Sequence, residues 1–190
     1  MAVDGKTVAL AKLLHEECKH LLHLYTERQS LPSLPVSGGQ LVSIPPLTPQ
    51  LSSSERLCFL HAALRACLSL LEDVIAREDS EFSDTLEDEY VNQRRTVKDR
   101  LGHLVLTTER QLQEVVRCQA TVTKVPDLMD GGAFALKKWI LQVLQDLVHW
   151  SGKTVETLQS PSARTSRKAP IKTRASRGRG TNQQRKRLRK

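Results

Sequence analysis

Residues 131–158 read GGAFALKKWILQVLQDLVHWSGKTVETL, and this stretch decides the fold. At about 100° per residue, its apolar side chains gather on one face of a helix. That face consists of Leu136, Ile140, Val143, Leu144, Leu147, Val155 and Leu158. Asp130 is a suitable N-cap, and the two glycines that follow it mark the start of the helix. We therefore expect a helix over residues 132–159 with its apolar face in a core.

The same helix has two features that a simple core helix does not need. Phe134 lies in the first turn, about 120° from the apolar face, and Lys137 follows one turn later. A separate flank carries Trp139, Asp146, Trp150 and Lys153. Both features are candidates for a binding surface. The alternatives are that Phe134 folds back onto residues 125–129 and that the tryptophans are half-buried packing residues.

The rest of the chain predicts three more helices, over residues 6–28, 53–77 and 85–120, the second capped by Ser53 or Ser54. Residues 31–52 contain five of the chain's eight prolines and form a long connection, as do residues 121–130. Residues 78–84 form a short acidic turn, and the polar residues 92–95 indicate a kink or break in the third helix. Two long crossovers around one short turn are typical of up-up-down-down bundles. We therefore predict an all-α, long-chain four-helix bundle over residues 1–160.

The positive charge is concentrated at the carboxyl end. The chain has a net charge of +8, with 29 basic and 21 acidic residues, and residues 161–190 hold 12 of the basic residues and no acidic one. Residues 1–160 therefore carry 17 − 21 = −4. The tail has almost no apolar side chain, so we expect it to be disordered. Its candidate polyanion-binding or nuclear localisation residues are Lys168, Arg185, Lys186, Arg187, Arg189 and Lys190. Heparan sulphate or nucleic acid would bind there without base specificity. The alternative is a solubilising tail.

The four cysteines, Cys18, Cys58, Cys67 and Cys118, lie within helical patterns and form no CxxC pair. The amino terminus lacks a secretory signal, and no apolar run approaches the ~20 residues that cross a bilayer. We therefore expect cytoplasmic synthesis and free, mostly buried thiols. A bridge between helices, formed after release from the cell, is the alternative.

The sequence offers no catalytic pattern, such as a nucleophile elbow, a phosphate loop or a dinucleotide fingerprint. His15, His20 and His23 share a helix with Glu16 and Glu17. They lack the spacing of a known metal site, so we interpret them as a solvated face. We expect neither an enzyme nor a cofactor.

The helix at residues 132–159 also carries a family resemblance. Asp-Gly-Gly-x-Phe-x-x-Lys-x-Trp at residues 130–139, followed by Val-Leu-Gln-Asp-Leu-x-x-Trp at residues 143–150, resembles the last helix of ciliary neurotrophic factor-type cytokines. These belong to the interleukin-6 family of helical cytokines. A weaker similarity occurs at residues 54–57 and 70–73, and elsewhere the agreement is in architecture.

The resemblance implies a neurotrophic cytokine that bridges receptor chains and triggers Janus-kinase signalling outside the cell after non-conventional release. It implies that Phe134 and Lys137 contact a leukaemia inhibitory factor receptor-type chain. An alpha receptor of the ciliary neurotrophic factor type would meet Asp146, Trp150 and Lys153. The shared interleukin-6-family signal-transducing chain would meet the first and third helices.

The sequence departs from the family pattern in two places. Gln159 stands where a basic residue is expected, and the first crossover has no tryptophan near Thr48. The identity of the alpha receptor therefore stays open. The rival interpretations are a cardiotrophin-type ligand and an intracellular helical bundle that binds nucleic acid or other polyanions through its basic tail.

Overall fold

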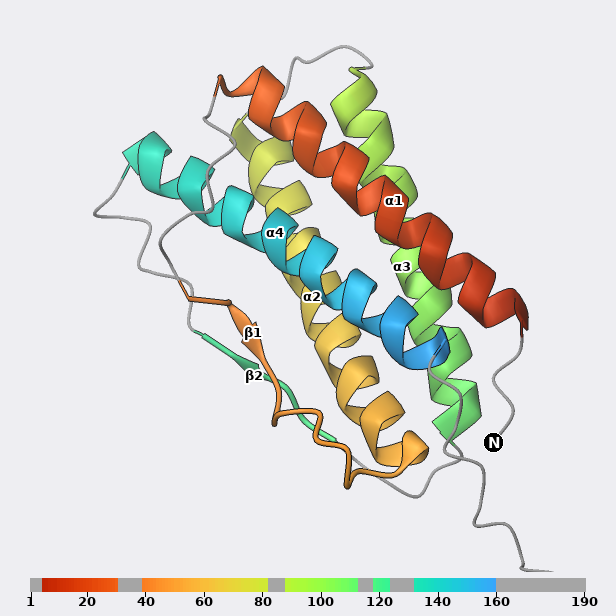
Figure 1. Ribbon diagram of the computed structural model, residues 1–190. Helices are drawn as coiled ribbons and strands as arrows, with labels where there is room; N and C mark the ends of the chain where they lie inside the picture. Colours follow the sequence, from red (N-terminus) through yellow and green to blue (C-terminus); the bar gives the residue numbers. More distant parts are fainter. Residues whose placement is uncertain (1–4, 31–38, 82–87, 113–117, 124–131, 160–190) are drawn as a thin grey trace, which may run out of the picture.

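A computed structural model describes residues 5–30, 39–81, 88–112, 118–123 and 132–159. Within these ranges the chain forms a bundle of four helices, α1 (Gly5–Arg28), α2 (Ser53–Glu81), α3 (Glu89–Leu112) and α4 (Gly132–Gln159). Two short strands, β1 (Val42–Ser43) and β2 (Thr121–Val122), lie along the bundle (Figure 1). The fold is therefore all-α with almost no strand, as the helical periodicity predicts. None of the described helices combines the length and the hydrophobicity needed to span a bilayer.

Helices α1 and α2 each pack against both α3 and α4. Side-chain contacts near the helix ends show the directions of these pairs. They join Gln111 with Thr7, Tyr25 with Lys137, and Tyr90 with Glu78. Each contact joins the end of one helix to the start of its neighbour, so α1 is antiparallel to α3 and α4, and α2 is antiparallel to α3. Figure 1 shows α1 and α2 running one way and α3 and α4 the other.

The apolar face predicted for α4 lies in the core. Its residues are buried except Val155, which is partly buried. Helix α4 also buries Trp139, Leu141 and Trp150, which lie outside that face. The buried surface is wider than predicted because α4 contacts α1, α2 and strand β1.

Helix α2 begins with a capping box. The Ser52 hydroxyl accepts a hydrogen bond from the backbone N–H of Glu55 at 3.2 Å. In return, the Glu55 carboxylate accepts from the Ser52 N–H at 2.8 Å. These contacts satisfy two backbone donors that a helix start leaves unpaired. The N-cap is therefore Ser52. The prediction of Ser53 or Ser54 is wrong by one or two residues, because both of these lie inside the helix.

The predicted bounds of two helices, α2 and α3, are also wrong. Helix α2 continues to Glu81, so much of the predicted acidic turn at 78–84 is helical. Helix α3 spans Glu89–Leu112, whereas the sequence predicted a helix over residues 85–120. Asp88 and residues 118–120 are not helical, and residues 85–87 and 113–117 lie outside the described residues. There is no break at residues 92–95, because Arg94 is buried there and forms ion pairs with α2.

The two long connections pair with each other, which the sequence did not predict. Val42 lies opposite Val122 and Ser43 opposite Thr121 in an antiparallel register. The backbone N–H of Thr123 continues this pairing by donating to the Leu41 carbonyl at 2.8 Å. A pairing this short has little local sequence signal, because it depends on two distant segments meeting.

The expectation of free thiols is wrong for two of the four cysteines. Cys58 on α2 and Cys118 form a disulfide with a Cα–Cα distance of 5.6 Å. Cys18 and Cys67 are free and buried. The bridge forms because α3 ends before Cys118, so that the chain returns to the first turns of α2.

Candidate functional site

Phe134 is the most exposed large apolar side chain among the described residues, with 73% of its surface accessible. It lies in the first turn of α4, two residues after Gly132, whose φ of 58° is in the left-handed region that glycine adopts readily. Leu136 and Ile140 point the other way, into the core. The ring is therefore exposed, as the helical wheel predicts. The alternative, a contact with residues 125–129, lies outside the described residues.

Lys137 lies three positions after Phe134 on the same side of α4 and is partly exposed. Its backbone carbonyl accepts a hydrogen bond from the Tyr25 hydroxyl of α1 at 3.1 Å. The Tyr25 ring is fully buried and packs against the Tyr90 ring, with 5.7 Å between the centroids. Burial raises the pKa of Tyr25 far above its ordinary value, so the hydroxyl stays a donor. The Tyr25 hydroxyl thus links the end of α1 to the first turns of α4, from which Phe134 projects.

The structure does not bring Asp146 and Trp150 into a surface with Lys153. Asp146 and Trp150 are 5% and 6% exposed, and both bind the backbone of Val42 in β1. The Val42 N–H donates to Asp146 Oδ2 at 2.8 Å, and Trp150 Nε1 donates to the Val42 carbonyl at 3.2 Å. Two buried side chains that hold a strand offer no contact surface in this conformation, so we correct their assignment to a structural role.

Lys153 and Trp139, the other two residues of this flank, differ in exposure. Lys153 is partly exposed and pairs with Glu156 at 2.8 Å. Trp139 is 1% exposed and lies beneath the Arg77 guanidinium, 5.1 Å from the ring centroid. Of the residues predicted for the alpha receptor, Lys153 alone stays a candidate. The tail residues Lys168, Arg185, Lys186, Arg187, Arg189 and Lys190 lie outside the described residues.

Burial raises the pKa of Asp146, and hydrogen bonds from the Val42 and Leu41 backbones oppose this shift. A carboxyl group with a raised pKa holds its proton in the folded state at a pH where the unfolded chain has lost it. Its contribution to stability therefore falls as pH rises through the raised pKa. Asp146→Asn cannot ionise but keeps an acceptor oxygen for the Val42 N–H. The unfolding free energy of the wild type relative to Asp146→Asn should fall as pH rises above about 4.

Urea unfolding of both proteins at several pH values measures this difference. Asp146→Ala is the control, because it leaves the Val42 N–H without its acceptor and should lose about 1–3 kcal/mol. A wild-type advantage over Asp146→Asn that grows with pH would mean that the hydrogen bonds outweigh burial at this carboxylate.

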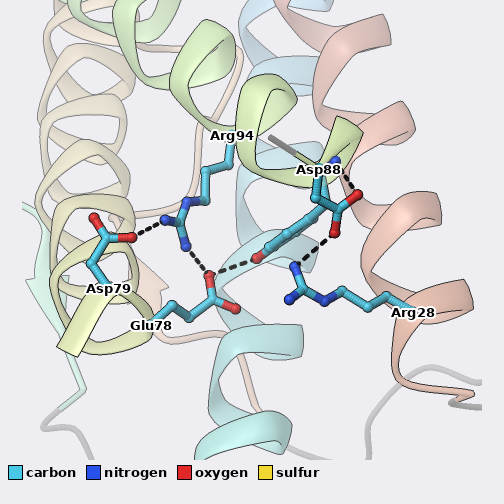
Figure 2. A network of polar contacts seen from close by, with 6 residues as sticks. Arg28, Glu78, Asp79, Asp88 and Arg94 are labelled. Carbon is cyan, nitrogen blue, oxygen red and sulfur yellow. Dashed lines mark hydrogen bonds and ion pairs between the residues drawn. The ribbon is translucent and has the colours of Figure 1, made fainter. Parts of the chain in front are cut away.

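A buried polar network joins α2 and α3, and Figure 2 shows it at close range. Arg94 on α3 is 3% exposed at its side chain and pairs with Glu78, which is 9% exposed. The second guanidinium nitrogen binds Asp79. The Tyr90 hydroxyl donates to Glu78 at 2.9 Å. Burial raises the pKa of Tyr90, and the negative charge of Glu78 raises it further, so the Tyr90 hydroxyl also stays protonated.

A second ion pair extends this network to α1. Arg28, in the last turn of α1, lies 3.1 Å from Asp88, just before α3. The Arg28 guanidinium also lies over the Tyr90 ring, 5.2 Å from its centroid. Three helix ends therefore meet around Tyr90, at the end of the bundle where α4 begins.

Sequence reasoning missed this network, although a signal was present. Tyr90, Arg94, Val97 and Leu101 follow one another at helical spacing, so Arg94 occupies a core position. Glu78 continues the buried series Leu71 and Val74 on α2 in the same way. Opposite charges at core positions near adjoining helix ends predict a buried ion pair.

Within the described ranges, no group of three or more histidine, cysteine or carboxylate side chains is arranged to hold a metal ion. The histidines of α1 have separate neighbours. His15 lies 3.0 Å from the Ser151 hydroxyl, while His20 and His23 approach Glu89 and Glu27. Among the described residues, the most exposed large apolar side chain remains that of Phe134, in the first turn of α4. No protein-family model matches the chain, and its sequence matches no curated protein.

Proposed function

We propose that the chain is a helical cytokine of the interleukin-6 type that resembles ciliary neurotrophic factor and acts by holding receptor chains together. The observation that carries this proposal is the solvent-exposed ring of Phe134, with Lys137 beside it, at the start of α4. In this proposal, the four-helix bundle is the body that presents separate surfaces to the different receptor chains.

The arrangement of the helices supports the long-chain, up-up-down-down form of this proposal. Helix α3, which follows the short connection after α2, is antiparallel to both α1 and α2. The long segments between α1 and α2, and between α3 and α4, contain the two paired strands. This combination is the one expected where two long crossovers run along a bundle.

Phe134 and Lys137 have the chemistry of a binding hot spot. A phenyl ring that enters a pocket on a partner removes a large apolar area from water, and hot-spot side chains contribute about 2 kcal/mol or more each. The nearby ammonium group favours a partner with a negative surface. We propose a leukaemia inhibitory factor receptor-type chain as the partner of this turn. Lys153 remains the candidate contact for an alpha receptor.

The double variant Phe134→Ala, Lys137→Ala tests the proposal. Binding to an isolated leukaemia inhibitory factor receptor-type chain, measured by surface plasmon resonance, should weaken about 100-fold or more. Signalling on cells that carry this chain, the shared signal-transducing chain and a ciliary neurotrophic factor-type alpha receptor should fall in parallel. Circular dichroism should not change, because Phe134 is exposed and Tyr25 binds the backbone of Lys137.

Leu13→Ala is the matched control. Leu13 is an apolar side chain of α1 with 47% exposure, in the half of α1 that packs near Ser151 and away from the start of α4. It should bind the same receptor chain as tightly as the wild type. Normal binding by the double variant, or no binding by the wild type, would contradict the proposed function.

A further inference from the structure

The segment 118–123 is attached to the bundle by few described contacts. Cys118 forms the disulfide with Cys58 of α2, and Ala120 packs against the core. Beyond that point the attachment is the short pairing of β2 with β1. Residues 121–123 are all exposed, so their side chains add little buried surface. A two-stranded pairing of this length is not stable by itself in water.

Strand β1 is attached much more firmly than β2. The Val42 side chain is fully buried, and its N–H and carbonyl bind Asp146 and Trp150 of α4. Leu41 is 5% exposed and belongs to the same core. None of these contacts involves β2, so β1 stays in place if residues 118–123 leave.

We propose that the Cys58–Cys118 disulfide is a redox-sensitive latch. Its reduction frees residues 118–123 from α2, while the four helices and β1 stay packed. The disulfide is the one covalent attachment of this segment within the described residues, and the rest of its attachment is non-covalent and mostly at the surface. The core of the bundle, by contrast, is formed by side chains of the four helices and of Leu41 and Val42, and neither bridged cysteine belongs to it.

The reductant is a small thiol, R–SH. Its thiolate attacks the sulfur of Cys118, which is only partly buried, whereas Cys58 is 2% exposed. The disulfide bond breaks, and Cys58 leaves as a thiolate that takes a proton from solvent. A second R–SH then resolves the mixed disulfide and releases R–S–S–R and the Cys118 thiol. The protein disulfide gains two electrons, and two small thiols are oxidised.

The other two cysteines do not compete in this exchange. Cys18 and Cys67 are each 1% exposed inside the bundle. Burial raises the pKa of Cys18 to about 12 and raises the pKa of Cys67 well above its ordinary value, so neither forms the reactive thiolate. The chemistry is therefore confined to the pair that holds β2.

The test is amide hydrogen exchange of the full chain, followed by NMR with and without dithiothreitol. The Thr123 N–H, which donates to Leu41, should exchange about tenfold faster or more after reduction. The Leu144 amide in the middle of α4 should keep its protection, and helical circular dichroism should not change. Iodoacetamide with mass spectrometry should then label Cys118 but not Cys18 or Cys67. Re-oxidation with glutathione disulfide should restore the slow exchange at Thr123.

Cys118→Ser is the matched variant. Its Thr123 amide should exchange at the fast rate with or without dithiothreitol. Equal exchange at Thr123 in oxidised and reduced wild type would overturn the proposal, because the strand pairing alone would then hold the segment. Loss of helical signal on reduction would also overturn it, because the bridge would then support the whole fold. Neither readout involves a receptor, so the result is independent of the proposed function.

Discussion

Arg94→Ala should lower the free energy of unfolding by about 3–5 kcal/mol. The substitution removes the guanidinium that neutralises Glu78, whose side chain is 9% exposed between α2 and α3. Glu78 would keep the hydrogen bond from the Tyr90 hydroxyl but would lose its charged partner. A buried carboxylate without a cation must either stay ionised in a poorly solvated site or take up a proton, and both lower stability at neutral pH. Urea unfolding followed by circular dichroism measures the loss.

Two further variants distinguish the stability contribution of the buried Arg94–Glu78 pair from that of a surface charge. Asp79→Ala removes the other carboxylate that binds Arg94, but Asp79 is 56% exposed, so the loss should be below about 1 kcal/mol. The double variant Glu78→Leu, Arg94→Met replaces both charges with apolar side chains and should recover part of the stability lost in Arg94→Ala, because it leaves no unpaired charge but removes the acceptor of the Tyr90 hydroxyl. If Arg94→Ala and Asp79→Ala lost similar amounts, the network would not be acting as a buried ion pair.

The parts of the fold that depend on local periodicity could be predicted from the sequence. The bounds of α4 coincide with the range expected from its apolar spacing, and six of the seven residues predicted for its apolar face are buried. The exposure of Phe134 follows from the same helical spacing, because the position of a residue within one helical turn sets the direction in which its side chain points. Its role in receptor binding stays a prediction.

The parts that depend on distant segments could not be predicted in this way. Asp146 appears on a wheel as a charged flank residue, and its burial becomes evident only when Val42 of the first crossover lies against it. Cys58 and Cys118 are 60 residues apart, and their pairing depends on α3 ending before Cys118. The disulfide and the strand pairing have this same origin, because both follow from where the second crossover begins.

The double variant Cys58→Ala, Cys118→Ala should lower the free energy of unfolding by about 3 kcal/mol. The two cysteines are 60 residues apart, and closing a loop of that length removes about 4 kcal/mol of chain entropy from the unfolded state at 25 °C. Part of this is offset, because residues 118–123 also gain freedom in the folded state once the bridge is absent. The loss comes mainly from the unfolded chain, so the helical content of the folded protein should stay the same. Dithiothreitol should lower the urea midpoint of the wild type to that of the variant and should not affect the variant. Equal midpoints for the oxidised and reduced wild type would contradict this account of the bridge.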